Sequence, residues 1–329
     1  MHSLGSKVTI QSGDLIQYQE LLPTRGYQSM VESIVHFGVG QLDNIESVSI
    51  EWPDGKKQIL LNVAANQVLA VDYAEAISDG LGRKKTASTL FVENASKAGI
   101  DFVHQENTFD DYDKQILLPH KLSQFGPFVA KGDVNGDQLE DIFVGGASGQ
   151  AGAVYVQKTD GTFMRLANSA FVQDKAYEDM HAAFFDADSD GDEDIYIVSG
   201  GNANEVNSPM YYDRLYLNKG KGKFSPTKGK MPNAAVSGSC VKPFDFDGDG
   251  DLDLFIGGRH VPHNYPSPAP SRILENKGGQ FVKLDDKRTP DFYKLGMVTD
   301  AVWTDFDSDG STDLIVCLLY TSPSPRDRG

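Results

Sequence analysis

The chain has 329 residues, a formal net charge of −17 and two cysteines. The negative charge argues against binding to nucleic acid or to an anionic membrane surface, and two cysteines cannot form a disulfide framework. No run of 18 apolar residues occurs, so the sequence predicts no transmembrane helix, and the first residues lack the apolar stretch of a signal peptide.

A small β domain is predicted over residues 1–75. Apolar and polar side chains alternate there, and turn signals stand at Gly13-Asp14 and Pro53-Asp54-Gly55. The clearest predicted strands are residues 7–10, 15–21, 48–52 and 58–61.

This domain resembles the ASPIC/UnbV domain, which commonly accompanies FG-GAP repeats. The stretches that carry the resemblance are Gly26-Tyr27-Gln28-Ser29, His36-Phe37-Gly38-Val39-Gly40 and Trp52-Pro53-Asp54-Gly55. The match begins near Gly5, as if an earlier strand were missing, and it implies no biochemical role. His36 has no carboxylate or cysteine at ligand spacing, so we expect a packed structural histidine.

The alternation stops over residues 76–88, which contain Arg83-Lys84-Lys85 and are predicted to be a linker. A second domain is predicted over residues 89–316. Its first part, residues 99–128, is expected to supply the strands of a propeller blade that lacks a metal loop.

Four acidic loops of nine residues recur in the second domain, with starts 53, 59 and 60 residues apart, which indicates a repeat architecture. Positions 1, 3, 5, 7 and 9 are Asp133, Asn135, Asp137, Leu139 and Asp141 in loop 1, Asp186, Asp188, Asp190, Asp192 and Asp194 in loop 2, Asp245, Asp247, Asp249, Asp251 and Asp253 in loop 3, and Asp305, Asp307, Asp309, Ser311 and Asp313 in loop 4.

Carboxylates on alternate positions are the ligands that Ca²⁺ prefers, so we expect side-chain ligands at positions 1, 3, 5 and 9 and the backbone carbonyl at position 7. An EF-hand would need Glu at position 12 and a helix after the loop. Position 12 is instead Val144, Ile197, Ile256 or Val316, each within an apolar β-type run. The loops hold nineteen of the 47 acidic residues, and four Ca²⁺ would change the net charge from −17 to −9.

A β-hairpin signature follows three of the loops, at residues 155–163, 215–224 and 273–281. Each has an apolar strand, a turn with Gly after Asn or Asp, and an aromatic residue. With the strands around the loop, each repeat supplies about four strands, the size of a propeller blade.

The repeats resemble FG-GAP (VCBS-type) repeats, the calcium-binding blades of integrin α-subunit propellers. The resemblance covers residues 89–316 and implies an all-β fold, with an incomplete β-propeller of about four blades and about four structural Ca²⁺. Loop 1 departs from the pattern at Asn135 and Gln138, which leaves its calcium occupancy open.

Three further histidines are candidate functional residues. His181 could face a central channel, but a polar residue at a strand start is the expected interpretation. His260 and His263 could form half of a zinc site, yet Pro262 predicts an irregular loop and no further ligand is evident.

Residues 317–329 break the repeat pattern with a Ser/Pro/Arg-rich stretch, which we interpret as a non-native tail. Cys317 would then have no role in the native protein.

The sequence shows no GxSxG, HExxH or phosphate-binding glycine loop, and metal ligation accounts for its paired carboxylates. We therefore predict a non-enzymatic, calcium-binding module, extracellular or at the cell surface, that binds a protein or a glycan in adhesion. One alternative is an enzyme or enzyme subunit in polysaccharide processing, which would bring His, Tyr and Arg together away from the metal loops. Another is a structural spacer, with no concave apolar or aromatic patch.

Overall fold

The computed structural model describes residues 4–24, 30–78, 91–227, 229–232, 234–284, 287, 292 and 295–319. The chain divides into two compact units, Met1–Val92 and Glu93–Gly329. Residues 26–29 of the first resemblance, 79–88 of the predicted linker and 320–329 of the predicted tail lie outside the described residues.

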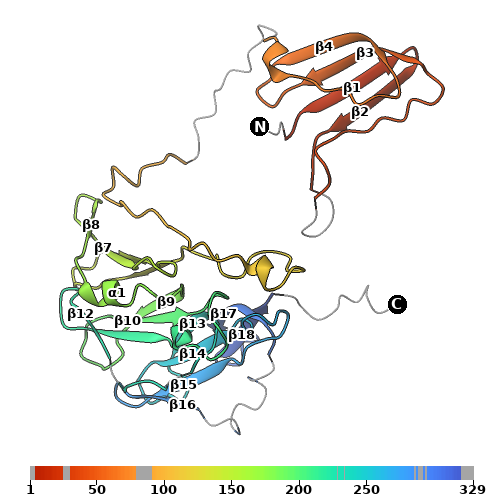
Figure 1. Ribbon diagram of the computed structural model, residues 1–329. Helices are drawn as coiled ribbons and strands as arrows, with labels where there is room; N and C mark the ends of the chain where they lie inside the picture. The colour runs from red at the N-terminus through yellow and green to blue at the C-terminus, as the bar shows by residue number, and fades with distance from the viewer. Residues whose placement is uncertain are drawn as a thin grey trace. The chain divides into compact units, whose positions relative to one another are not determined.

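The first unit is an antiparallel sheet with the strand order β2-β1-β3-β4 (Figure 1). Its elements are β1 (Lys7–Ser12), β2 (Leu15–Glu20), β3 (Asn44–Glu51), β4 (Lys57–Ala64) and a 3-10 turn, η1 (Tyr73–Glu75). Each predicted strand falls on one of these four. Side chains alternate across a strand, so Ile10, Val48 and Ile50 point to the same face and form its buried core.

The prediction of a packed His36 is wrong, because its side chain is exposed. The neighbouring Phe37 and Val39 pack against the core instead. The backbone carbonyl of His36 accepts a hydrogen bond from the Gln19 side chain. The segment therefore runs along the sheet with its odd-numbered side chains inward and His36 outward.

The second unit contains three four-stranded antiparallel sheets and one two-stranded sheet, in the propeller-like order predicted from the repeats. The strands are β5 (Val129–Gly132), β6 (Asp141–Val144), β7 (Ala153–Gln157) and β8 (Phe163–Arg165), then β9 (Asp179–Phe185), β10 (Asp194–Ser199), β11 (Arg214–Asn218) and β12 (Phe224–Pro226), then β13 (Gly238–Phe244), β14 (Asp253–Gly258), β15 (Arg272–Asn276) and β16 (Phe281–Lys283), and finally β17 (Val298–Thr304) and β18 (Asp313–Leu318). Among the described residues of this unit, three short helices, η2 (Asp111–Asp113), α1 (Ser169–Gln173) and η3 (Pro209–Tyr211), lie in the connections.

Successive sheets pack face to face through their first strands, β5 against β9, β9 against β13 and β13 against β17 (Figure 1). A separate apolar cluster fills each interface. Phe143 and Tyr216 lie in the first cluster, Phe185 and Leu254 in the second, and Phe255 in the third. The core of this unit therefore lies between sheets, as expected for a repeat architecture.

The expectation that residues 99–128 form blade strands is wrong. Among the described residues they contain only the 3-10 turn η2. Their polar groups have partners outside any ladder: the Gln105 N–H donates to Gln150 Oε1 at 2.9 Å, and Gln150 Nε2 donates to the Val103 carbonyl at 2.7 Å. Ile100 and Phe102 pack against Tyr155, so the segment covers the first sheet.

Candidate metal centres

The four acidic loops connect the first and second strands of the four sheets of the second unit. Position 9 of each loop is the first residue of the second strand, at Asp141, Asp194, Asp253 and Asp313. The strand pairing therefore fixes this carboxylate next to the end of the first strand, opposite Gly132, Phe185, Phe244 and Thr304.

Carboxylate oxygens converge in three of the loops. In each, one oxygen from positions 1, 3 and 9 lies within 4.8 Å of the other two. The triads are Asp186, Asp188 and Asp194, then Asp245, Asp247 and Asp253, then Asp305, Asp307 and Asp313. These triads could hold a metal ion, because three oxygens at such distances can contact one cation.

The carboxylate at position 1 organises each loop. In loop 3, Asp245 Oδ1 accepts from the N–H groups of Gly248 and Asp249 at 2.7 and 3.2 Å, and its Oδ2 accepts from Gly250 at 3.0 Å. The other three loops repeat the bonds from positions 5 and 6. The sequence folds in this way because a short Asp side chain readily caps nearby N–H groups.

Positions 4 and 6 have left-handed backbones in all four loops. Loop 3 has glycine at both positions, with φ of 77° at Gly248 and 96° at Gly250. Gln138 adopts the same conformation at φ 68°, so loop 1 keeps the shape of the other loops despite its departure from glycine.

The carboxylate at position 5 is not part of the triads found among the described residues. Asp137, Asp190, Asp249 and Asp309 each accept a hydrogen bond from the N–H of position 7, at 2.7–3.0 Å. At position 7, the Asp251 side chain accepts from Ser189 Oγ of loop 2 and from the Gly278 N–H, each at 3.0 Å.

The carboxylate at position 9 joins the loop to the third strand. Asp194 Oδ2 accepts from the Ala187 N–H at 2.9 Å, and its Oδ1 accepts from the Asn218 N–H at 2.6 Å. Asp253 makes the equivalent bonds with Phe246 and Asn276. Burial raises the pKa of Asp194 to about 6, and the charges of Asp188 and Asp190 add to the effect.

Two asparagines beside the loops were missed by sequence reasoning. Asn218 Nδ2 donates to the Val134 carbonyl of loop 1 at 2.8 Å, and Asn276 Nδ2 donates to the Ala187 carbonyl of loop 2 at 3.0 Å. Each asparagine thus ties its own sheet to the loop of the preceding one. Each asparagine begins an Asn-Lys-Gly turn of the hairpin signature, and this repeated turn was the sequence signal that could have identified both residues.

The donor set of loop 2 fits a hard cation. Asp188 Oδ1 is buried and has no hydrogen-bond partner among the described residues, and such a buried oxygen is costly unless something satisfies it. Lys219 and Lys230 lie 3.8 and 3.9 Å from Asp188 Oδ2, which supplies part of the compensating charge.

Loop 1 differs at position 3. Asn135 Nδ2 donates to Asp137 Oδ2 at 3.1 Å, and Asn135 Oδ1 accepts from the Asp137 N–H at 2.9 Å. The amide can offer one neutral oxygen to a cation, so loop 1 has three carboxylates at positions 1, 3, 5 and 9, where each of the other loops has four.

The three histidines lie away from the triads. His181, in β9, stacks on Phe128 with ring centroids 5.7 Å apart, and burial lowers its pKa to about 4. His260 is buried, with Nε2 3.3 Å from Asn202 Oδ1. No group of three metal-ligating side chains in the described part of the chain includes His260 or His263.

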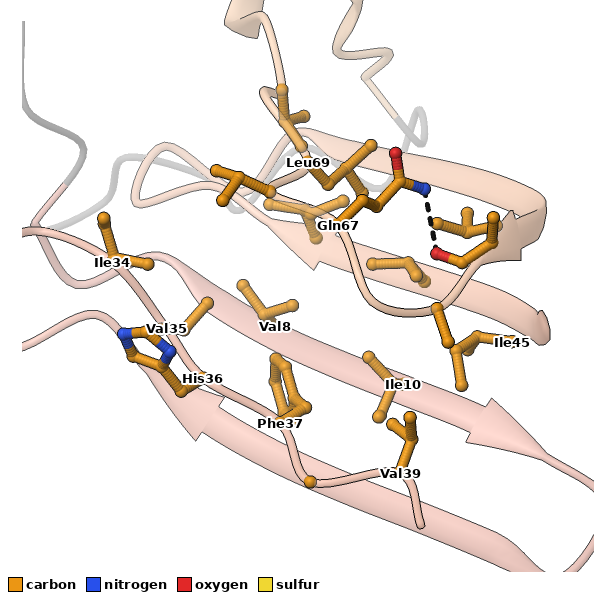
Figure 2. A pocket seen from close by; sticks show the side chains of 18 of the residues that line it. Val8, Ile10, Ile34, Val35, His36, Phe37, Val39, Ile45, Gln67 and Leu69 are labelled. Atoms are coloured by element: carbon orange, nitrogen blue, oxygen red, sulfur yellow. Dashed lines mark hydrogen bonds between the residues drawn. The ribbon is translucent and has the colours of Figure 1, made fainter. Parts of the chain in front are cut away.

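The first unit has a hollow of about 760 Å³ between its sheet and residues 33–40 and 63–71 (Figure 2). Val8, Ile10, Phe37 and Val39 line it, and His36 lies at its edge. Gln67 Nε2 donates to the Ala64 carbonyl at 2.8 Å beside it.

The chain was compared with known proteins. The ASPIC and UnbV family model matches residues 2–78, and the FG-GAP-like repeat model matches residues 133–197 and 186–256. Cartilage acidic protein 1 of Xenopus tropicalis is 29% identical over 204 residues, and the human protein of that name is 29% identical over 202. Each alignment covers 58% of this chain and 28% of the relative, so the chain spans less than a third of their length. None of the described helices is long and apolar enough to span a membrane.

Proposed function

Because the chain carries an ASPIC and UnbV domain followed by FG-GAP-like repeats, we propose that it is a calcium-stabilised β-propeller module of an extracellular or cell-surface protein, which binds a protein or glycan in adhesion. The observation that carries the proposal is the same convergence of carboxylates at positions 1, 3 and 9 in three successive repeats. An isolated acidic turn has no reason to recur with this geometry.

Calcium would have a structural role in all four loops. Asp or Asn side chains at positions 1, 3, 5 and 9 and the carbonyl of position 7 would surround each ion, with loop 1 contributing Asn135 at position 3. The position 5 carboxylate would reach the ion with the oxygen that its bond to position 7 leaves free. The ion would offset the repulsion between carboxylates, which is about 1–4 kcal/mol for each close pair at about 4 Å.

Calcium suits these loops better than magnesium, because Ca²⁺ accepts irregular oxygen cages and Mg²⁺ demands a near-ideal octahedron. Extracellular modules commonly have dissociation constants of about 10⁻⁴–10⁻³ M, which are filled where calcium is plentiful. The name shared by the two relatives, cartilage acidic protein 1, is consistent with an acidic protein outside the cell.

An enzyme or enzyme subunit acting on polysaccharide is the second candidate. It is favoured by one observation, that His120, Arg259, His260 and Tyr265 gather away from the metal loops, where their charges affect one another. Release of reducing ends from a polysaccharide panel by the chain would support this candidate over a binding role.

A thermal melt of the full chain tests the proposal. One site at ten times its dissociation constant adds about 1.4 kcal/mol, and one kcal/mol shifts the Tm of a unit of this size by about 2–4 °C. We expect the second unit to melt about 10–20 °C higher in calcium than in EDTA, with a small effect of magnesium. Equal melting temperatures in EDTA and in 5 mM calcium would contradict the proposal.

A further inference from the structure

Six polar residues gather at the ends of the sheets opposite the metal loops, and we call them the Arg259 cluster: Asp111, His120, Asn202, Arg259, His260 and His263. β14 begins at Asp253 of loop 3 and ends one residue before Arg259. Six residues of strand separate them, a distance of about 20 Å at 3.3 Å per residue. The cluster is therefore distinct from the calcium loops.

Arg259 is a half-buried positive charge without a counter-ion. Its guanidinium lies 4.6 Å from the centre of the Phe125 ring. In the described part of the chain no carboxylate lies within ion-pair distance of it, and its buried Nε has no hydrogen-bond partner. The buried Arg214 and Arg272 are paired with Asp179 and Asp213. An unpaired, half-buried arginine in a chain of charge −17 can bind an oxyanion, because the geometry of its guanidinium N–H groups matches that of a carboxylate.

A series of hydrogen bonds determines which ring nitrogen of His260 carries the proton. The His260 side chain is buried, with an exposed fraction of 1%. Asn202 Nδ2 donates to Asp111 Oδ1 at 2.7 Å, which turns Asn202 Oδ1 toward the His263 N–H at 2.8 Å and His260 Nε2 at 3.3 Å. Ser123 holds Asp111 from the other side. His260 must then carry its proton on Nε2, and Nδ1 is left as an acceptor.

Nδ1 of His260 has no hydrogen-bond donor in the described part of the chain, and other ring nitrogens of the cluster also lack a partner there. His260 Nδ1, His120 Nδ1 and both ring nitrogens of His263 are buried without a hydrogen-bond partner among the described residues. Burial and the charge of Arg259 lower the pKa of His260 to about 4, so the ring is neutral at physiological pH. The cluster therefore presents one cationic donor, Arg259, beside the neutral imidazole of His260, whose Nδ1 can accept from a hydroxyl group.

We propose that the Arg259 cluster binds an acidic sugar, with the carboxylate of the sugar on Arg259 and a sugar hydroxyl donating to Nδ1 of His260. A metal ion fits poorly, because the Arg259 charge would repel it and no metal-ligating triad lies there in the described residues. An acidic side chain would satisfy Arg259 but would bring no hydroxyl to His260.

This inference rests on the proposed function, since it names the ligand class of the same module. The test is a calorimetric titration of the full chain in 5 mM calcium with digalacturonate, with its neutral counterpart galactobiose and with tetraglutamate. We expect digalacturonate to bind at least tenfold more tightly than either. Arg259→Gln should weaken it by about tenfold to a hundredfold, the usual value of a hydrogen bond to a charged group. The control Arg165→Gln, at an exposed arginine of the same unit, should leave binding unchanged.

Unchanged binding by Arg259→Gln would overturn the inference, because the sugar would then be held elsewhere, for example by loop calcium. Equal binding of tetraglutamate would assign the cluster to acidic peptides and overturn it too. If Arg259→Gln does not fold, the ring NMR signals of His260 in the unaltered chain decide, since they must shift with digalacturonate. A calcium-raised Tm without sugar binding overturns this inference alone, whereas sugar binding without a calcium shift overturns the calcium function alone.

Discussion

At the scale of single residues, the side chains at positions 1 and 9 have two roles in loops 2, 3 and 4. Asp245 and Asp253 accept backbone N–H groups that shape loop 3, and they also belong to its triad. Asp247, at position 3, is exposed and makes no hydrogen bond that shapes the loop. Replacing it therefore separates calcium binding from loop folding.

We predict that Asp247→Ala removes one calcium from the stoichiometry. It should cost about 1.4 kcal/mol of unfolding free energy at ten times the dissociation constant, and almost nothing in EDTA. Calcium titration followed by urea denaturation in both conditions measures this. Asp160→Ala, in an exposed hairpin turn, is the control. An unchanged calcium stoichiometry in Asp247→Ala would count against the ligand assignment.

A second prediction concerns Glu178, a buried carboxyl beside β9. Burial raises its pKa from 4.5 to about 8, although the Ser148 N–H donates to Oε2 at 2.7 Å. Between pH 4.5 and 8 the folded chain keeps a proton that the unfolded chain has lost. The contribution of Glu178 to the free energy of unfolding therefore falls as pH rises through this window, by up to about 1.4 kcal/mol per pH unit.

Glu178→Gln should remove this dependence and should be more stable than the unaltered chain at pH 9. Urea denaturation at pH 5, 7 and 9 gives the slopes. The exposed Glu205 provides the matched control, Glu205→Gln. Parallel pH slopes for Glu178→Gln and the unaltered chain would refute the assignment.

At the scale of elements, Asn218 and Asn276 connect neighbouring sheets. Asn276 is buried, and its side chain donates to Ala187 of loop 2 at 3.0 Å and to Leu252 of its own loop at 3.2 Å. Without the amide, two carbonyls would lose their donor at a sheet interface.

We predict that Asn276→Ala lowers the free energy of unfolding by about 1–3 kcal/mol, the usual cost of an unsatisfied buried group. It should also lower calcium affinity at loop 2, because the carbonyl of Ala187 would no longer be held. Urea denaturation and calcium titration measure the two effects. Asn264→Ala removes an amide from an exposed loop and should change neither. Loss of stability without any change at loop 2 would show that the bond does not reach the metal site.

The strands and loops were predictable because their signals are local. Alternation placed the strands of the first unit, and the Asp spacing placed positions 1, 3 and 9 of the triads. The orientation of the Asp249 side chain was harder to predict from the sequence, because it depends on which N–H groups lie near it in the folded loop. The irregular course of residues 99–128 depends on Gln150 and Tyr155, which are distant in the sequence.

At the scale of the molecule, the Arg259 cluster shows the limit of sequence reasoning. Asp111, Asn202 and Arg259 are separated by 91 and 57 positions, and no motif links them. The acidic composition of the chain was explained in part by the four loops, which hold nineteen of the 47 acidic residues. The adhesive, extracellular role remains a proposal that the melting and titration experiments address.

The bonds from Asn218 and Asn276 have one more consequence. The second and third sheets are each tied to the loop of the preceding sheet, and loop 2 is tied to loop 3 through Ser189 and Asp251. A calcium ion that ordered one loop would therefore favour ion binding at the next, as in a linear array of repeats stabilised by nearest neighbours. Such an array fills cooperatively, so the module would respond to calcium as a threshold rather than in proportion to its concentration.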